Sequence, residues 1–349
     1  MTTDDTPTPS PAPASSHAIQ AELVAVLVAV SAGQPRIMTT RHGQTLPCGP
    51  FTMTHRTLQQ GMRAWVESET HHPIGYVEQL YTFADPERLQ QHGARNIAIS
   101  YLGLTREQRG SNGSLNAAAD QATWRNWYDF FPWEDRRSDY AQALLETRIV
   151  PALRDWAQAA ADPAGRAHRL QRVHYQFGLD EDTPWNEDFV LQRYELLYEA
   201  RLVSEALRQA DSEPQPAACA PDGTGRPDTA SEDVRALPGL AMLYDHRRIL
   251  ATGMARLRAK LKYRPVMFEL MPETFTLLQL QQTAEAITGC WLHKQNFRRL
   301  IEQQALVEET GETTLGQAGR PAKLYRFRSG VMHERAISGS KLPLVNVQG

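Results

Sequence analysis

The side chains best suited to a chemical task are basic residues near the C-terminus. In WLHKQNFRRLIEQQ, helical turns of about 100° per residue place one group of side chains on a single side: Phe297, Leu300, Ile301 and Gln304. Gln295, Arg298, Arg299 and Glu302 then point the opposite way. Of these, Gln295, Arg298 and Arg299, together with Lys294 and Asn296, are the candidates for binding DNA, because long donors near the start of a recognition helix reach base edges and phosphates.

A preceding helix and a following hairpin are the elements that must position this helix. FTLLQLQQTAEAITG repeats apolar residues at the three- and four-residue steps of a helix that buries one stripe: Leu277, Leu280, Ala284 and Ile287. Gly289 should end it. Further on, ALVEE, a loop from Thr310 to Gly319 and RPAKLYRF predict a two-stranded wing. Arg320 and Lys323 of this wing are expected to hold the phosphate backbone.

Positive charge is concentrated in this part of the chain. Residues 251–335 hold thirteen Lys or Arg and eight Asp or Glu, a net charge of +5, although the whole 349-residue chain has a formal charge of −3. A single basic helix face is more often merely solvated. Combined with the two helices and the wing, the local positive field instead favours a winged-helix DNA-binding domain over residues 263–335.

Several motifs resemble a known family. FTLLQLQQTAEAITG, KQNFRRLI and GRPAKLYRF look like the winged-helix half of the Nudix-related transcriptional regulators that control NAD biosynthesis genes, particularly the branch found in alphaproteobacteria. DHRRIL (Asp245–Leu250) and KLKYRPVMFELMP (Lys260–Pro272) fit the junction between domains in that family. The resemblance implies a regulator, expected to be a repressor, that binds double-stranded DNA and a small nucleotide effector.

The N-terminal part has the pattern of a mixed sheet with one helix. AELVAVLVAV, PRIMTT, YVEQLYTF and NIAISYLGL read as strands, LPCGPF as a loop and residues 58–69 as a helix. In this order they resemble a Nudix domain, whose first part we place at residues 18–104 and whose returning helix we place at 237–262. The predicted fold class is α+β: a Nudix-like α/β/α sandwich with a mixed sheet and a helical insertion, plus a C-terminal winged helix-turn-helix.

The predicted Nudix helix has lost most of its metal-binding residues. A working helix needs Arg-Glu-apolar-any-Glu-Glu-any-Gly, because carboxylates on one face hold divalent cations against a pyrophosphate. The resemblance puts Ala64 at the arginine, Trp65 and Ser68 at two glutamates and His71 at the glycine, so Glu69 alone remains. We therefore expect no metal site, no cofactor and no enzymatic activity. The alternative is an active Nudix hydrolase of ADP-ribose or a related dinucleotide.

Two hypotheses apply to this altered domain: a sensor that keeps its nucleotide pocket, or an inert scaffold. The family resemblance favours a sensor and implies an effector such as ADP-ribose, NAD or ATP. Arg41 and Arg56 are candidates for meeting its phosphates, Phe51 or Tyr81 for stacking its base, and Glu69 lies at the same site. Spacing alone does not identify this ligand.

Residues 105–209 read as a helical insertion. They include the aromatic run TWRNWYDFFPWEDRR, for which core packing is favoured over a cage for a base. One helix face collects Val190, Tyr194, Leu197 and Tyr198. Pro151 should kink or divide the helix before it. Residues 210–236, rich in Pro, Gly, Ser and Ala, read as a flexible loop. A third hypothesis is an adaptor that binds a protein partner through this insertion.

Composition indicates a cytoplasmic, nucleoid-associated protein without a membrane partner. Three scattered cysteines, Cys48, Cys219 and Cys290, give neither a disulfide framework nor a zinc cluster. Residues 1–17 read as a disordered tail rather than a signal peptide, residues 336–349 read as a second tail, and AELVAVLVAV is too short to cross a bilayer. Because one recognition helix covers only a few base pairs, we expect a homodimer on a palindromic operator.

Overall fold

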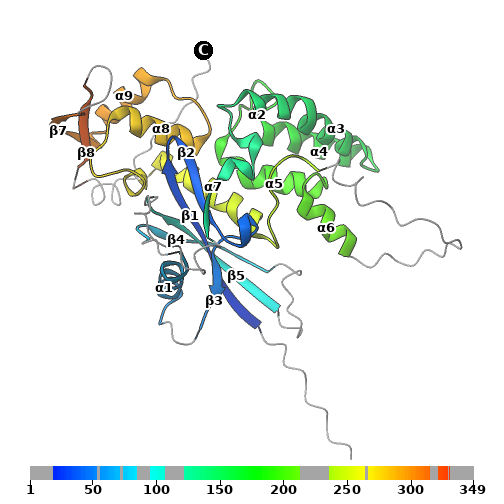
Figure 1. Cartoon of the computed structure of the whole chain (residues 1–349). Coiled ribbons are helices and arrows are strands. Elements are labelled where there is room, and N and C mark those ends of the chain that lie inside the picture. Colours follow the sequence, from blue (N-terminus) through cyan, green and yellow to red (C-terminus); the bar gives the residue numbers. More distant parts are fainter. Residues whose placement is uncertain are drawn as a thin grey trace, which may run out of the picture.

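A mixed β-sheet forms the centre of the molecule (Figure 1). The computed structural model describes residues 19–52, 56–70, 74–84, 95–106, 122–212, 236–263, 266–314, 321–328 and 330. The sheet strands are β1 (Ile19–Ser31), β2 (Gln34–Thr39), β3 (Cys48–Pro50), β4 (Val77–Phe83), β5 (Arg95–Leu104) and β6 (Thr123–Asn126). Their order is β4-β5-β1-β2-β6, and β3 pairs with β1. β1 and β5 run parallel, while the other paired strands run antiparallel.

The central strand β1 is apolar along most of its length because both faces of the sheet are covered. Leu23, Ala25 and Leu27 lie in the cluster under α1 (Leu58–Thr70). The alternate residues of β1 lie in the cluster under α7 (His246–Tyr263), where Gly253 packs so closely that an added Cβ would collide with Val26. A strand buried on both faces needs such a continuous apolar run. Within the described ranges, no helix combines the length and the apolar character needed to cross a membrane.

The sheet contains two strands that sequence patterns did not predict. Thr123–Asn126, within the range predicted to be helical, forms the edge strand β6 and pairs with β2. Cys48–Pro50, predicted to be part of a loop, forms the short strand β3. Both segments are too short to show a period-two pattern, so their pairing is decided by the neighbouring strand rather than by their own residues.

A helical part follows the sheet. It contains α2 (Asp139–Leu144), α3 (Val150–Gln158), α4 (Pro163–Phe177), α5 (Val190–Glu199) and α6 (Ser204–Ser212). The predicted division at Pro151 occurs as a π-helical turn, Leu145–Ile149, between α2 and α3, because proline cannot donate the backbone hydrogen bond of a regular helix. The aromatic run lies in the core, as predicted: Trp127, Phe130, Phe131 and Trp133 are fully buried.

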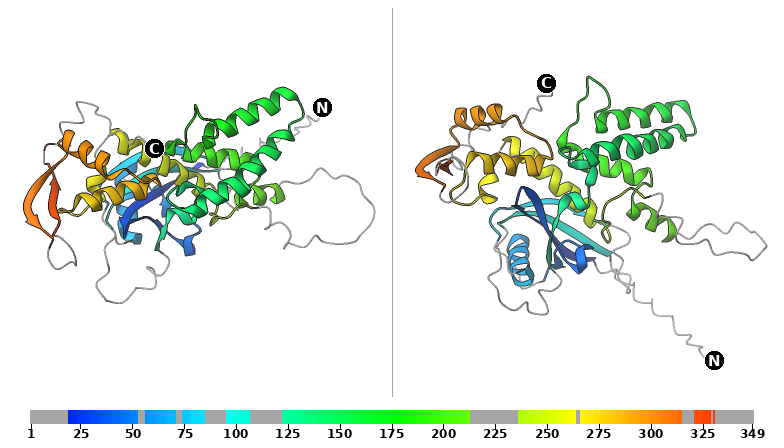
Figure 2. Two further views of the ribbon diagram at one scale, coloured as in Figure 1. Left: turned by 90° about the horizontal axis from the view of Figure 1, so that it is seen from above. Right: turned by 45° about the horizontal axis from the view of Figure 1, so that its top comes forward.

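The winged helix lies at the end of the molecule opposite the helical part, with α7 between them (Figure 2). It consists of the 3-10 turn Val266–Glu269, α8 (Leu277–Thr288), α9 (Lys294–Gln303), β7 (Val307–Thr313) and β8 (Lys323–Phe327). Thr276 and Gln279 form a capping box at the start of α8, and Gly289 ends α8 in the left-handed conformation (φ 73°). The predicted α+β fold, with a mixed-sheet sandwich and a C-terminal winged helix, is confirmed.

Candidate DNA-binding face and effector region

The recognition helix α9 is held by its apolar side. Phe297 and Ile301, one turn apart, are buried against the rest of the winged helix, and Leu300 is half-buried. The turn before α9 is fixed by buried polar groups of α8: Glu285 accepts a hydrogen bond from the Leu292 amide at 3.0 Å, and Gln281 donates to the Leu292 carbonyl at 2.9 Å. These bonds set the direction in which α9 leaves the turn.

All five predicted DNA-binding residues of α9 are exposed: Lys294, Gln295, Asn296, Arg298 and Arg299. Within the described part of the chain, none of these side chains has a hydrogen bond or ion pair. Cations without a protein partner keep their full capacity to bind phosphate or a guanine edge. The structure therefore leaves all five side chains exposed on α9, while predicted Arg320 lies outside the described residues.

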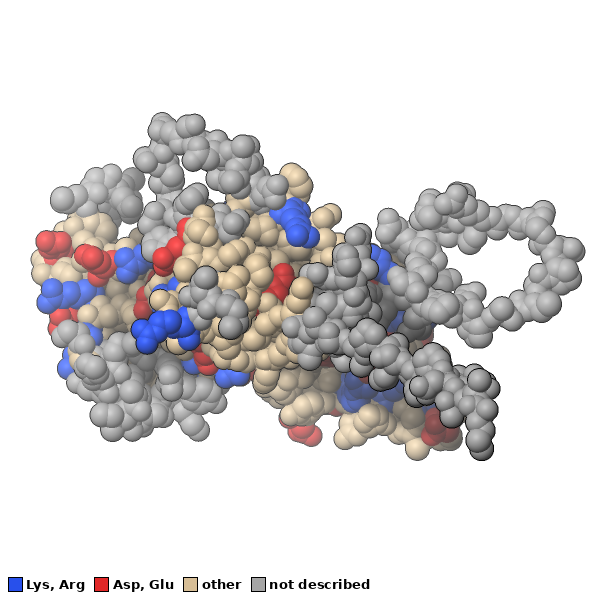
Figure 3. All heavy atoms as spheres, turned by 90° about the horizontal axis from the view of Figure 1, so that it is seen from below, with Lys and Arg blue, Asp and Glu red and all other residues tan. Residues whose placement is uncertain are grey.

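The wing differs from α9 because its cations are paired. The Lys323 ammonium lies 2.9 Å from Glu309, and the Arg326 guanidinium lies 2.6 Å from Glu308 on the facing strand. The hydrogen bond to Lys323 lowers the pKa of Glu309, and the same bond raises the pKa of Lys323. Basic and acidic side chains alternate at this end of the molecule in Figure 3. The antiparallel pairing of ALVEE with KLYRF agrees with the predicted wing, but the ion pairs across the two strands were not predicted from the sequence.

A buried ionic cluster joins the winged helix to the helical part. The Glu134 carboxylate accepts two hydrogen bonds from Arg193, at 2.7 and 2.8 Å, and one from Arg258 of α7, at 2.8 Å. All three side chains are fully buried. Burial alone would raise the pKa of Glu134, but the two guanidinium groups outweigh burial and hold that pKa below its usual value. The carboxylate is therefore ionised in the folded protein.

The same cluster reaches the backbone of α8. Arg258 donates to the Ile287 carbonyl at 2.9 Å, and the Tyr128 hydroxyl donates to the Ala286 carbonyl at 2.8 Å. A Cβ at Gly289 would collide with the Glu134 carbonyl oxygen, so this glycine allows a close approach as well as a left-handed turn. Sequence reasoning missed this junction because its members come from segments far apart in the chain.

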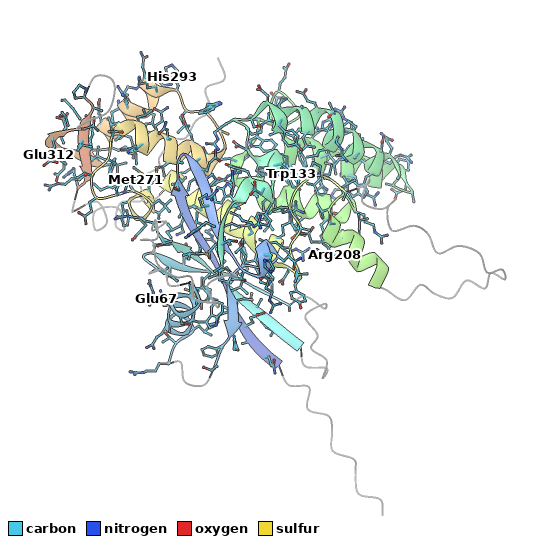
Figure 4. All side chains as sticks on the ribbon, in the orientation of Figure 1. Glu67, Trp133, Arg208, Met271, His293 and Glu312 are labelled. Carbon is cyan, nitrogen blue, oxygen red and sulfur yellow. The ribbon has the colours of Figure 1, made fainter. Side chains whose placement is uncertain are left out.

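Helix α1, whose sequence resembles an altered Nudix helix, turns its tryptophan toward the sheet. A Cβ at Gly49 of β3 would collide with the Trp65 indole, so the ring lies directly on this glycine. Ser68 donates to the Trp65 carbonyl, while Glu67 is exposed on α1, on the left side of the molecule in Figure 4. The side chain of Glu69 and residue His71 lie outside the described residues. Among the described residues, no three His, Cys, Asp or Glu side chains gather closely enough to hold a metal ion.

The predicted effector residues are spread over different parts of the sheet. Arg41 lies exposed in the 3-10 turn Arg41–Gly43, and Arg56 lies exposed just before α1. Phe51 packs into the cluster under α1, whereas Tyr81 of β4 lies 6.0 Å from the Arg256 guanidinium of α7. α1 and α7 cover opposite faces of the sheet, so the structure does not bring Phe51 and Tyr81 together.

Two hollows lie near residues that sequence reasoning did not select. One of about 440 Å³ follows the outer side of α1 and is lined by Thr57, Gln59, Gln60, Arg63, Ala64 and Glu67. Arg63 donates there to the carbonyls of Ile74 and Gly75. A larger hollow of about 720 Å³ lies in the helical part beside Arg136, Tyr175 and Trp185. Both volumes suit a small molecule.

One curated relative is similar to this chain over a quarter of its length. Over 88 residues, or 25% of its length, this chain is 41% identical to the ADPR responsive transcriptional repressor NtrR of Acinetobacter baylyi. This match spans about a third of that relative, 35% of its length.

The solved structures that align with most of this chain have low sequence identity to this chain. Shewanella oneidensis NrtR complexed with a 27mer DNA is 16% identical, with 92% of this chain and 98% of that chain covered and a TM-score of 0.49. A MutT/nudix family protein from Enterococcus faecalis is 14% identical, with 93% and 90% covered and a TM-score of 0.45.

The family assignment therefore comes from the C-terminal domain. Residues 267–327 match the family model described as the NrtR DNA-binding winged helix domain. The matched range begins in the 3-10 turn Val266–Glu269, contains α8, α9 and β7, and ends with β8. Residues 267–327 are thus a DNA-binding winged helix domain of the NrtR family.

Proposed function

We propose that the chain is a DNA-binding transcriptional repressor of NAD biosynthesis genes. The observation that carries the proposal is the face of α9, where Lys294, Arg298 and Arg299 are exposed inside a domain of the NrtR DNA-binding family. The curated relative that matches a quarter of the chain is named a transcriptional repressor, which supports repression rather than activation of the target genes. A protein of this kind acts in the cytoplasm, on the nucleoid.

The effector in this proposal is a nucleotide bound by the Nudix-like part. The same relative is ADPR responsive, so ADP-ribose is the first candidate, with NAD and ATP as the others. Trp65 and Ser68 stand at two of the three positions where the family pattern requires metal-binding glutamates, so binding without hydrolysis is expected. The hollow along the outer side of α1 offers space for a small ligand close to this helix.

The operator in this proposal is a palindrome bound by a homodimer. A second recognition helix roughly doubles the number of contacts when the half-sites lie about 34 Å apart, or a multiple of that distance. An effector that binds the DNA-free form about a hundredfold more tightly would change operator affinity by about 2.7 kcal/mol.

Selection from a pool of random duplexes, followed by a gel-shift titration, tests the DNA part of the proposal. We expect recovered sequences with inverted symmetry and a complex that contains two protein chains. Recovery of no preferred sequence at low ionic strength would overturn the repressor function.

A thermal-shift series with ADP-ribose, NAD and ATP, repeated with the selected duplex, tests the effector part. A ligand that binds the native fold must raise its melting temperature, and an inducing ligand must also release the duplex. Magnesium-dependent cleavage of ADP-ribose that is lost in Glu69→Gln would instead establish the hydrolase alternative.

A further inference from the structure

Trp291, in the turn between α8 and α9, is unusually exposed for its residue type. Its exposed fraction is 68%, the largest among the big apolar side chains of the described residues. All seven tryptophans of the chain are described, and the other six are buried or half-buried. An exposed indole loses the favourable free energy of burying a large apolar surface. We therefore looked for a function of Trp291 in the turn before α9.

The backbone is fixed on both sides of Trp291, and this fixes the position from which the indole ring extends. Gly289 begins the turn in the left-handed conformation, and Cys290 is buried. On the other side of Trp291, both backbone polar groups of Leu292 are bound by side chains of α8. A turn fixed at both ends leaves the indole no route into the core.

A salt-bridged arginine and an exposed lysine lie near Trp291. The Arg137 guanidinium lies 5.8 Å from the ring centroid and is itself anchored by Asp135 and by the Gly33 carbonyl. Lys294, three residues further on, is exposed at the start of α9. His293 between them marks this outer edge of the winged helix in Figure 4. Because Asp135 neutralises Arg137, the charge available here comes from Lys294, which favours a partner with negative charge.

We propose that Trp291 is a DNA-contact residue that binds the phosphodiester backbone beside the groove that α9 enters. The indole Nε1–H donates a hydrogen bond to a phosphate oxygen, and the ring packs against the adjoining sugar. Contacts of this kind set the register of a recognition helix on the duplex and carry no sequence information. The inference rests on the proposed function, since it needs a protein that binds DNA.

Affinity measurements with four variants separate this role from general electrostatics. Trp291→Ala should weaken binding about tenfold, and Trp291→Phe, which keeps a ring but has no donor, by an intermediate factor. Both losses should be equal for the selected operator and for a random duplex, with no change in the salt slope, because a neutral donor releases no counterion. Lys294→Ala should instead reduce that slope by about one. Tyr175→Ala, in the helical part, removes another exposed ring and is the matched control.

Acrylamide quenching of tryptophan fluorescence gives a second readout that does not depend on affinity. The random duplex should protect the accessible fluorescence of the wild-type protein, and Trp291→Phe should abolish that accessible component before DNA is added. Unchanged operator affinity in Trp291→Ala, with an unchanged melting temperature, would overturn the inference and leave the proposed function intact. Tryptophan fluorescence that acrylamide still quenches in the wild-type complex with DNA would also overturn the inference. Failure of the wild-type protein to bind either duplex would overturn both.

Discussion

Arginines perform opposite tasks in two regions of this molecule. In the junction, Arg193 and Arg258 are fully buried and share the Glu134 carboxylate. On α9, Arg298 and Arg299 are exposed and have no ion pair within the described residues. A buried cation must be paired, because an unpaired one loses its hydration without compensation. A cation that is to bind DNA must remain unpaired, because each internal partner competes with the phosphate.

The wing lies between these two extremes. Lys323 and Arg326 are exposed, yet each is held by a glutamate of β7. To bind a phosphate, either cation must first leave its carboxylate. We therefore expect α9 to contribute more to DNA affinity than the described part of the wing.

The largest expected effect is on stability, at the junction. Glu134→Gln leaves two buried guanidinium groups without a counter-charge, and we expect a loss of about 3–5 kcal/mol of unfolding free energy. Urea denaturation monitored by circular dichroism measures this loss. Arg299→Ala is the matched control, because removing an exposed cation should leave the unfolding free energy unchanged. A junction variant as stable as the wild type would remove the contrast between the two regions.

The pH dependence of the unfolding free energy should distinguish the contribution of the Glu134 charge from that of its packing. Its pKa is lowered in the folded state, so its contribution to stability is present above the ordinary value of 4.5 and is lost as the pH falls through the folded-state pKa. The stability difference between wild type and Glu134→Gln should therefore shrink progressively at pH values below 4.5. A difference that stays constant between pH 7 and acid unfolding would assign the loss to packing.

The next effect concerns DNA affinity rather than stability. Arg299→Ala should weaken operator binding by about 1–3 kcal/mol and relax base preference, because a bidentate arginine contact discriminates between bases. Fluorescence anisotropy with the selected duplex and with single-base variants of it measures both quantities. Arg326→Ala on the wing should cost less. A larger loss for the wing variant would reverse the ranking.

The smallest effect has the opposite sign. Glu309→Gln frees Lys323 for a phosphate, so we expect affinity to rise by a factor of roughly two to five and the salt slope to increase by about one. Lys323→Ala should cancel this gain in the double variant. If Glu309→Gln leaves both affinity and salt slope unchanged, Lys323 does not reach DNA.

The parts of the site that depend on local pattern could be predicted from the sequence. The period of α8 and α9, the glycine that ends α8 and the exposed position of Arg298 and Arg299 follow from residues within one or two turns of each other. The ion pair between Lys323 and Glu309 could not be predicted in this way. Its partners are set by the register of the two wing strands, which depends on the position of the hairpin turn.

The sequence alone determined a mixed sheet followed by a basic winged helix, and it has Trp65 and Ser68 where the Nudix pattern that it resembles has carboxylates. These features are encoded in contiguous residues, whose spacing fixes the face of the helix on which each side chain lies. Only the tertiary structure decided which cations are free. Glu134, Arg193 and Arg258 come from segments up to 124 residues apart, and their meeting depends on how the helical part packs against α7.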